Sequence, residues 1–166
     1  IIKPVKAKLM NLSFKKKYVS ESDLENINYT FFPLHTEPEV TLSVYSKPYI
    51  NQIEAIRLIS HNLPVGMYLL VKEHPWSVGK RPNSFFKKIL NIPNVKLVSP
   101  KISSTNLIKN ADLISVISGS IALEAMFLRK PAIVLGLTPF NFLPKTMLRY
   151  IENPMMLGGE IKELLK

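Results

Sequence analysis

A short apolar run that stops abruptly at charged residues constrains the fold of this chain more than any other sequence feature. The run Leu69-Leu70-Val71 comes shortly after Gly66 and gives way to Lys72-Glu73-His74-Pro75. An apolar segment of this length, bounded by glycine and proline, is typical of a strand buried on both faces of a parallel sheet. Ligands of open α/β sheets bind beyond the carboxyl ends of the strands, so the polar residues after Val71 are predicted to face a binding cleft.

Similar strand patterns recur along the chain and alternate with helical ones. The predicted strands span Tyr29–Leu34, Met67–Lys72, Asn94–Val98, Asp112–Ile117 and Lys130–Gly136. The predicted helices span Tyr49–Asn62, a segment through Phe85 and Leu90, Ser104–Asn110, Ile121–Arg129 and a closing segment at Glu160–Leu165. Strands that alternate with single helices form right-handed βαβ units. We therefore expect an α/β protein with a Rossmann-like, three-layer α/β/α architecture and a parallel sheet.

Length and charge distribution indicate one domain that follows a basic arm. A chain of 166 residues is long enough for one domain with its own core. Residues 1–27 show weak periodicity, and six lysines precede the first acidic residue, Glu21. We therefore expect a connector or arm over residues 1–27 and the folded domain over residues 28–166. The first residue is Ile1 rather than Met, so we expect a piece of a longer protein.

Composition limits the classes of partner and the cellular compartment. The net charge of +10 comes from 22 Lys plus Arg against 12 Asp plus Glu. This excess allows nucleic acid, an anionic membrane surface or a phosphorylated small molecule as a partner. No apolar run approaches the roughly 20 residues that span a bilayer, and the first residues lack a signal-peptide pattern. Cysteine is absent, which fits the cytoplasmic location that we expect.

Three polar loops leave the carboxyl ends of predicted strands and together form one candidate site. These loops are His35–Glu39, Lys72–Lys80 and Ser118-Gly119-Ser120. In the third loop a strand turns into a helix, which places free N–H groups and two hydroxyls at the positive end of a helix dipole. Gly119 would let the backbone approach an anion closely. The pattern is typical of a phosphate cradle, and the alternative is that one of the serines only caps the helix.

Several side chains in these loops carry suitable chemistry. His74 can donate a hydrogen bond to a phosphate or protonate a leaving group, because an ordinary histidine pKa of about 6.5 allows both states. Glu124 is placed to accept hydrogen bonds from ribose hydroxyls, and Glu37 and Glu39 are candidates for a general base or nucleophile. The alternative for each of these residues is a solvated surface side chain.

Charge neutralisation and metal binding are two further roles open to the basic and imidazole residues near these loops. Lys72, Lys80 and Arg81 can neutralise a diphosphate or an acidic sugar, with ordinary surface charge as the alternative. A metal site is not expected, because His35, His61 and His74 are scattered and lack metal-ligand spacing. The sequence contains neither a Gly-x-Gly-x-x-Gly nor a Walker loop, which argues against dinucleotide oxidoreductases and P-loop NTPases.

Taken in order, these motifs resemble the nucleotide-binding half of GT-B glycosyltransferases. The resemblance is carried by Phe32-Pro33-Leu34-His35 with Pro38-Glu39, by Val71-Lys72-Glu73-His74-Pro75, and by Ser118-Gly119-Ser120 with Glu124-Ala125 and Lys130-Pro131. It covers about residues 29–136 and is strongest to bacterial capsule and surface polysaccharide biosynthesis proteins, including the Kdo transferases of capsule export. Such enzymes place the active site between two Rossmann-like domains, so the resemblance implies a partner N-terminal domain.

The resemblance also implies roles for individual residues. The histidine of the His74-Pro75 pair, together with Ser118 and Ser120, would engage the phosphate of a CMP-sugar, and Glu124 would contact its ribose. The remaining expected substrate-binding residues are His35, Lys72, Pro75 and Gly119. The chain departs from the family pattern, which tends to have glutamine at the position of His35 and an aspartate in the loop that here holds Glu37 and Glu39. The catalytic carboxylate therefore stays open between these two glutamates.

The expected function is a nucleotide-sugar-binding domain of a glycosyltransferase in capsule or surface polysaccharide biosynthesis that uses a CMP-activated acidic sugar. No metal or other cofactor is expected. The expected partners are the nucleotide sugar, a glycan or glycolipid acceptor and the inner face of the membrane, but not nucleic acid. Two alternatives stay open: a UDP-sugar transferase or UDP-sugar epimerase-like domain, and a non-catalytic module whose basic face binds anionic lipid or nucleic acid.

Overall fold

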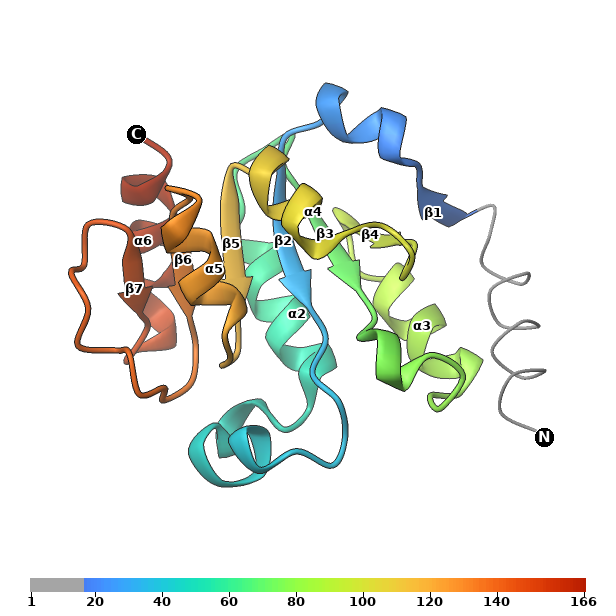
Figure 1. The fold of residues 1–166 in the computed structure, drawn as a ribbon, viewed down its shortest axis with the longest axis horizontal. Coiled ribbons are helices and arrows are strands. Elements are labelled where there is room, and N and C mark those ends of the chain that lie inside the picture. The colour runs from blue at the N-terminus through green and yellow to red at the C-terminus, as the bar shows by residue number, and fades with distance from the viewer. Residues whose placement is uncertain (1–16) are drawn as a thin grey trace.

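The computed structural model describes residues 17–166, which form a seven-stranded sheet in which every paired strand is parallel. The strands lie in the order β1-β4-β3-β2-β5-β6-β7 (Figure 1). Their bounds are β1 Tyr18–Val19, β2 Tyr29–Pro33, β3 Tyr68–Lys72, β4 Val95–Val98, β5 Leu113–Val116, β6 Ala132–Val134 and β7 Leu148–Tyr150. The predicted α/β class with a parallel sheet is thereby confirmed.

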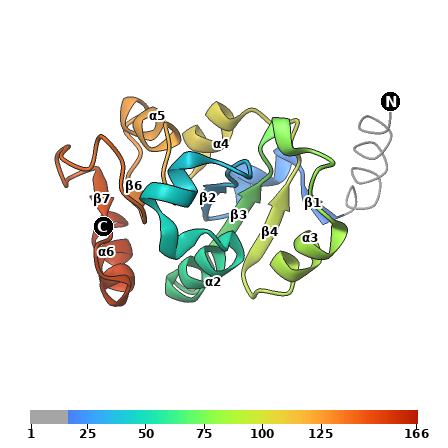
Figure 2. The ribbon, with the colours of Figure 1, turned by 90° about the horizontal axis from the view of Figure 1, so that it is seen from below.

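Helices cover both faces of the sheet, as the predicted three-layer architecture requires. Figure 2 shows α2, α3 and α6 on one face and α4 and α5 on the other. The α-helices are α2 Gln52–Asn62, α3 Asn83–Leu90, α4 Ser104–Asn110, α5 Ile121–Phe127 and α6 Leu157–Leu164. Short helical turns complete the fold: η2 Glu21–Asn26, η3 Thr41–Tyr45, η4 Lys47–Tyr49, η5 Pro75–Ser77 and η6 Pro154–Met156. Among residues 17–166, no helix is long and apolar enough to cross a bilayer.

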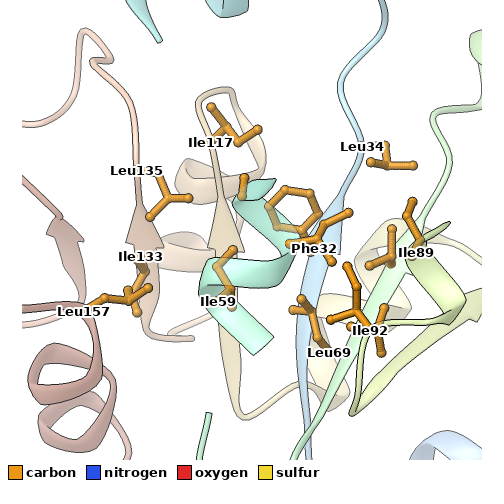
Figure 3. Close-up of a cluster of buried hydrophobic side chains, with 14 of the residues drawn as sticks. Phe32, Leu34, Ile59, Leu69, Ile89, Ile92, Ile117, Ile133, Leu135 and Leu157 are labelled. Carbon is orange, nitrogen blue, oxygen red and sulfur yellow. The ribbon is translucent and has the colours of Figure 1, made fainter. Parts of the chain in front are cut away.

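The period-two alternation of the strands divides the core into two clusters. Phe32 and Leu69 face α2 and α3, whereas their neighbours Phe31 and Leu70 belong to the cluster under α4 and α5. Figure 3 shows Phe32 and Leu69 beside Ile59 of α2. Burial of each such side chain stabilises the fold by about 1.5–3 kcal/mol, so both faces of the central strands are fixed by packing.

The direction of chain winding reverses at β2, and this reversal positions the candidate site. From β2 the chain proceeds outward through β3 to β4, with α2 and α3 on one face of the sheet. It then returns over the other face through α4 and enters β5 on the opposite side of β2. The loops that follow β2 and β5 therefore flank a topological switch point, where open α/β sheets bind their ligands.

The two edge strands were not predicted. Tyr18–Val19 pairs with β4 although it lies in the predicted connector, and Leu148–Tyr150 pairs with β6. Each strand is only two or three residues long, so neither shows a measurable alternation of apolar and polar residues. Residues 1–16 of the connector lie outside the described residues, and the boundary at residue 27 stays a prediction.

The last helix begins earlier than predicted, at Leu157 rather than Glu160. Its second and third residues are Gly158 and Gly159. Because glycine is a poor helix former, the sequence did not indicate that the helix begins before Glu160. Packing explains the first of them, because a Cβ atom at Gly158 would lie 2.8 Å from Asn62 Oδ1 at the end of α2. Contact with α2 therefore outweighs the local propensity.

Candidate functional site

A polar pocket of about 430 Å³ lies at the carboxyl ends of β2, β3 and β5. The three loops predicted to form one site all contribute to it. Of the predicted site residues, it is lined by His35, Glu39, Lys72, His74, Pro75, Ser118, Gly119, Ser120 and Glu124. Glu37 does not line it, and the sequence analysis assigned no role to Thr36, Ser104 and Ile121, which do. The fold thus brings together residues that are up to about ninety positions apart in the chain.

Protein groups satisfy every polar atom of His35. Gln52 Oε1 accepts a hydrogen bond from the backbone N–H of His35 at 2.8 Å, and the carbonyl oxygen of His35 accepts from Gln52 Nε2 at 3.3 Å and from Arg81 Nη2 at 2.5 Å. In the ring, Nδ1 lies 2.9 Å from Glu39 Oε2, and Nε2 accepts from the backbone N–H of Ser118 at 3.3 Å. His35 therefore links the loop after β2 to the loop after β5.

Glu39 is held as a carboxylate by its neighbours. Burial raises the pKa of Glu39, but hydrogen bonds from Thr41, His35 and Thr36 outweigh this effect, and the net shift is downward. Thr41 Oγ1 donates to Oε1 at 2.7 Å, and Thr36 Oγ1 donates to Oε2 at 3.4 Å. The carboxylate that faces the pocket is therefore already engaged by protein donors.

Glu37 lies on the other side of the same loop and turns away from the pocket. Its Oε1 accepts hydrogen bonds from Gln52 Nε2 and, at 3.2 Å, from Arg81 Nη2. The side chain is half exposed, whereas Arg81 is buried. Arg81 thus contacts protein groups rather than the pocket, unlike the expected role in neutralising a diphosphate, and Lys80 does not line the pocket. The catalytic role of Glu37 stays a prediction.

Two buried charged residues at the end of β3, Lys72 and Glu73, line the pocket. Lys72 is buried and donates from Nζ to Ser104 Oγ at 2.8 Å, and burial lowers the pKa of its ammonium group. Glu73 is only 3% exposed, and its Oε1 lies 3.6 Å from Arg81 Nη1. Burial raises the pKa of Glu73 to about 7 against the opposing effect of Arg81. Neither carboxylate oxygen of Glu73 has a hydrogen-bond partner.

His74 lines the pocket, and a backbone hydrogen bond defines the tautomer of its neutral ring. Its Nδ1 accepts a hydrogen bond from the backbone N–H of Trp76 at 3.2 Å, so the neutral ring carries its hydrogen on Nε2. Burial lowers the pKa of His74, the nearby Glu39 carboxylate opposes this effect, and Lys72 adds to it. The neutral ring is therefore favoured at pH 7, with Nε2–H as a hydrogen-bond donor.

The turn Ser118-Gly119-Ser120 offers hydroxyl groups that the protein does not use. Ser118 is buried, and its Oγ has no hydrogen-bond partner. Ser120 is the N-cap residue of α5, but its side chain makes no capping hydrogen bond, so the capping alternative is not supported for either serine. Gly119 has φ +123°, a conformation that L side chains rarely adopt, which explains glycine there. Glu124 is half-buried in the first turn of α5.

The sequence analysis missed two residues that organise this site. Gln52, the only glutamine in the sequence, clamps the backbone of His35, and Ser104 holds the Lys72 ammonium group. Nothing local distinguishes Gln52 from an ordinary residue in the first turn of a helix. Within residues 17–166, no cluster of three or more His, Cys, Asp or Glu residues is suited to hold a metal ion.

Comparison with known proteins finds a family match and structural relatives. A model of the family described as capsule polysaccharide biosynthesis protein matches residues 1–147. A search of curated protein sequences finds no match.

Three similar solved structures illustrate the fold. The UDP-GlcNAc 2-epimerase from Methanocaldococcus jannaschii superposes with a TM-score of 0.62 at 20% identity, over 96% of this chain and 43% of that one. KpsC from Thermosulfurimonas dismutans, a beta Kdo 2,7 transferase, gives 0.60 at 16% identity, over 93% and 52%. HepE from Anabaena, in complex with UDP-glucose, gives 0.57 at 12% identity, over 95% and 43%. This chain thus spans about half the length of the proteins it resembles, and the likeness concerns the fold.

Proposed function

Because this chain belongs to the family of capsule polysaccharide biosynthesis proteins, we propose that it is the nucleotide-sugar-binding domain of a glycosyltransferase. The observation that carries the proposal is that one pocket at the switch point of the sheet is lined by His74, whose neutral ring carries its hydrogen on Nε2, and by Ser118, whose hydroxyl has no protein partner among residues 17–166. Buried polar groups are costly without partners, so a free hydroxyl beside a pocket favours a ligand with hydrogen-bonding oxygens. A phosphate meets that requirement.

In the proposed complex, His74, Ser118 and Ser120 hold the donor phosphate, and Glu124 accepts hydrogen bonds from ribose hydroxyls. Sugar transfer breaks the bond between the anomeric carbon and the phosphate oxygen, and the bonding electrons pass to that oxygen. A hydrogen bond from His74 Nε2–H stabilises the charge that develops there. An oxygen of the acceptor, a glycan or glycolipid, forms the new bond and gives up its proton to a base.

The charge of the pocket favours a donor with a single phosphate, as in a CMP-sugar, over a donor with a diphosphate, as in a UDP-sugar. Among residues 17–166, Lys72 is the only lysine or arginine that lines the pocket, because Arg81 contacts Glu37 and Glu73. One lysine and one neutral histidine suit the single charged phosphate of a CMP-sugar, whereas a diphosphate would bring a second charge toward Glu39 and Glu124. This argument supports the CMP-sugar but leaves the sugar itself open.

Two competing functions remain to be tested. UDP-GlcNAc 2-epimerases superpose on this chain as well as the Kdo transferase does, so a UDP-sugar epimerase or transferase domain is the alternative within the same fold. The net charge of +10 allows a non-catalytic module that binds anionic lipid or nucleic acid. Because the chain spans about half of its structural relatives, we propose that a second domain completes the site. We also propose that the whole enzyme works at the inner face of the membrane.

Calorimetric titration of the protein with CMP, CDP, UDP and GDP tests the proposal. We expect CMP to bind most tightly, and at a hundredfold excess over its dissociation constant it should raise the free energy of unfolding by about 2.7 kcal/mol. His74→Ala should weaken CMP binding by about tenfold, equivalent to about 1.4 kcal/mol. His61→Ala is the matched control, since His61 is exposed on α2 and does not line the pocket.

Each other outcome of this titration selects a different function. Tighter binding of UDP would favour the UDP-sugar alternative. Binding that His74→Ala leaves intact and that falls steeply with salt concentration would favour the basic module. Absence of binding by all four nucleotides, in the protein with its second domain, would contradict the proposed function.

A further inference from the structure

A hydrogen bond joins the ring of His35 to the backbone of Ser118. This bond determines which ring nitrogen of His35 is the acceptor and which carries the hydrogen. The Ser118 N–H can only donate, so Nε2 of His35 must carry a lone pair. The hydrogen of the neutral ring then resides on Nδ1, 2.9 Å from Glu39 Oε2. The Ser118 N–H therefore donates to His35 Nε2, and His35 Nδ1–H donates to the Glu39 carboxylate.

We propose that Glu39 and His35 form a positioning pair that orients the Ser118-Gly119-Ser120 turn toward the ligand, and that neither side chain binds the ligand through its own polar atoms. This inference rests on the proposed function of the pocket. It gives new roles to two residues that the sequence analysis assigned to catalysis and substrate binding.

The surroundings of His35 leave none of its polar atoms available to a ligand. The side chain is 8% exposed, and Gln52 and Arg81 hold its backbone carbonyl group while Gln52 also accepts from its N–H. Both ring nitrogens already have partners within the protein. A ligand atom could bind either nitrogen only if one of these hydrogen bonds broke.

The turn that His35 holds is the part of the pocket whose groups are free. A Cβ atom at Gly119 would lie 3.6 Å from His35 Cε1, so the imidazole packs directly against the turn. The bond to Nε2 uses the Ser118 N–H and leaves the Ser118 hydroxyl without a partner. The pair thus satisfies a buried backbone group and fixes a residue that lines the pocket.

Two substitutions at His35 separate positioning from general stability. In His35→Gln, the side-chain amide oxygen reaches the place of Nε2 and can accept the Ser118 N–H. In His35→Asn, the shorter amide reaches only the place of Nδ1, so the contact with Glu39 survives and the bond to Ser118 is lost. Each variant keeps one of the two ring hydrogen bonds, and we expect similar losses of thermal stability.

The affinity for CMP should distinguish the two variants. We expect His35→Gln to stay within about threefold of the unaltered protein and His35→Asn to lose at least about tenfold. Equal losses in both variants, or a larger loss in His35→Gln, would overturn the inference. Absence of CMP binding by the unaltered protein with its second domain would instead count against the proposed function.

Nuclear magnetic resonance of the unaltered protein supplies a test that needs neither a variant nor a ligand. Long-range proton–nitrogen spectra should show the hydrogen of His35 on Nδ1, and the Ser118 amide should be protected from hydrogen exchange. His61 provides the reference for an exposed ring. A hydrogen on Nε2 of His35, or an unprotected Ser118 amide, would contradict the positioning pair.

Discussion

The two loops that face each other across the switch point are both polar, but they differ in how their polar groups are used. In the loop after β2, the side chains of His35, Glu37 and Glu39 all have protein partners. In the loop after β5, the Ser118 hydroxyl has none, and Ser120 makes no capping bond. The polar side chains of the first loop are therefore engaged within the protein, and we propose that the free hydroxyls of the second loop bind the ligand.

This difference shows that polar residues at the carboxyl edge of a sheet are not equivalent candidates for binding. A group whose hydrogen-bonding capacity is filled by the protein would have to break a bond before it could bind a ligand. A buried group without a partner lowers the free energy of the complex when a ligand supplies one. The variants below test this contrast in order of decreasing expected effect.

Removal of the clamp on His35 should have the largest effect. Gln52→Leu deprives the backbone N–H of His35 of its acceptor in a buried site, and loss of such a partner costs about 1–3 kcal/mol for each group left unsatisfied. We expect the free energy of unfolding to fall by about 3 kcal/mol in chemical denaturation. Asn110→Leu, at the exposed end of α4, is the control and should change it by less than about 0.5 kcal/mol. A small effect of Gln52→Leu would show that the first loop needs no such support.

Glu73 should make stability depend on pH. Its pKa in the folded protein is about 7, against an ordinary value of 4.5, so between these values the folded state binds a proton that the unfolded state lacks. The free energy of unfolding should therefore fall as pH rises through this window. Glu73→Gln should remove about 1–3 kcal/mol of that fall between pH 5 and pH 8.

Thermal melts across this pH range measure the effect. Glu54→Gln, at an exposed position of α2, is the matched control and should follow the unaltered protein. A Glu73→Gln variant with the same pH profile as the unaltered protein would show that Glu73 is charged throughout, in a full ion pair with Arg81.

Ser118→Ala should weaken binding without weakening the fold. The variant removes a buried hydroxyl that has no partner, so the free energy of unfolding should stay the same or rise. The affinity for CMP should fall by about tenfold in calorimetry, equivalent to about 1.4 kcal/mol. Ser115→Ala is the matched control, because Ser115 Oγ is also buried without a partner on β5 but does not line the pocket. Equal affinities of the two variants for CMP would show that the Ser118 hydroxyl does not bind the ligand.

Glu37→Gln should have the smallest effect. The side chain is half exposed and turned from the pocket, and a glutamine oxygen can still accept from Gln52 and Arg81. We expect CMP affinity within about twofold and stability within about 0.5 kcal/mol of the unaltered protein. Abolished sugar transfer with intact CMP binding would instead support Glu37 as the catalytic carboxylate.

Much of the fold was predictable because its signals are local. The central strands showed continuous apolar runs, and the short helix η2 begins at a capping box formed by Ser20 and Asp23. The edge strands Tyr18–Val19 and Leu148–Tyr150 were missed because a segment of two or three residues is too short to show an alternating hydrophobic pattern. Most predicted site residues line one pocket, because parallel strands direct their carboxyl ends to the same edge.

By itself, the sequence determined the layers, the succession of strands and helices, and the loops that meet at the carboxyl edge of the sheet. Only the tertiary structure decided which polar groups are engaged by the protein and which are free. The bond from Ser118 to His35 joins residues 83 positions apart, and the bond from Arg81 to His35 spans 46. The hydrophobic patterns that predict helices and strands extend over a few residues. Hydrogen-bond partners far apart in the sequence depend instead on strand order and on the side of the sheet that each crossover covers.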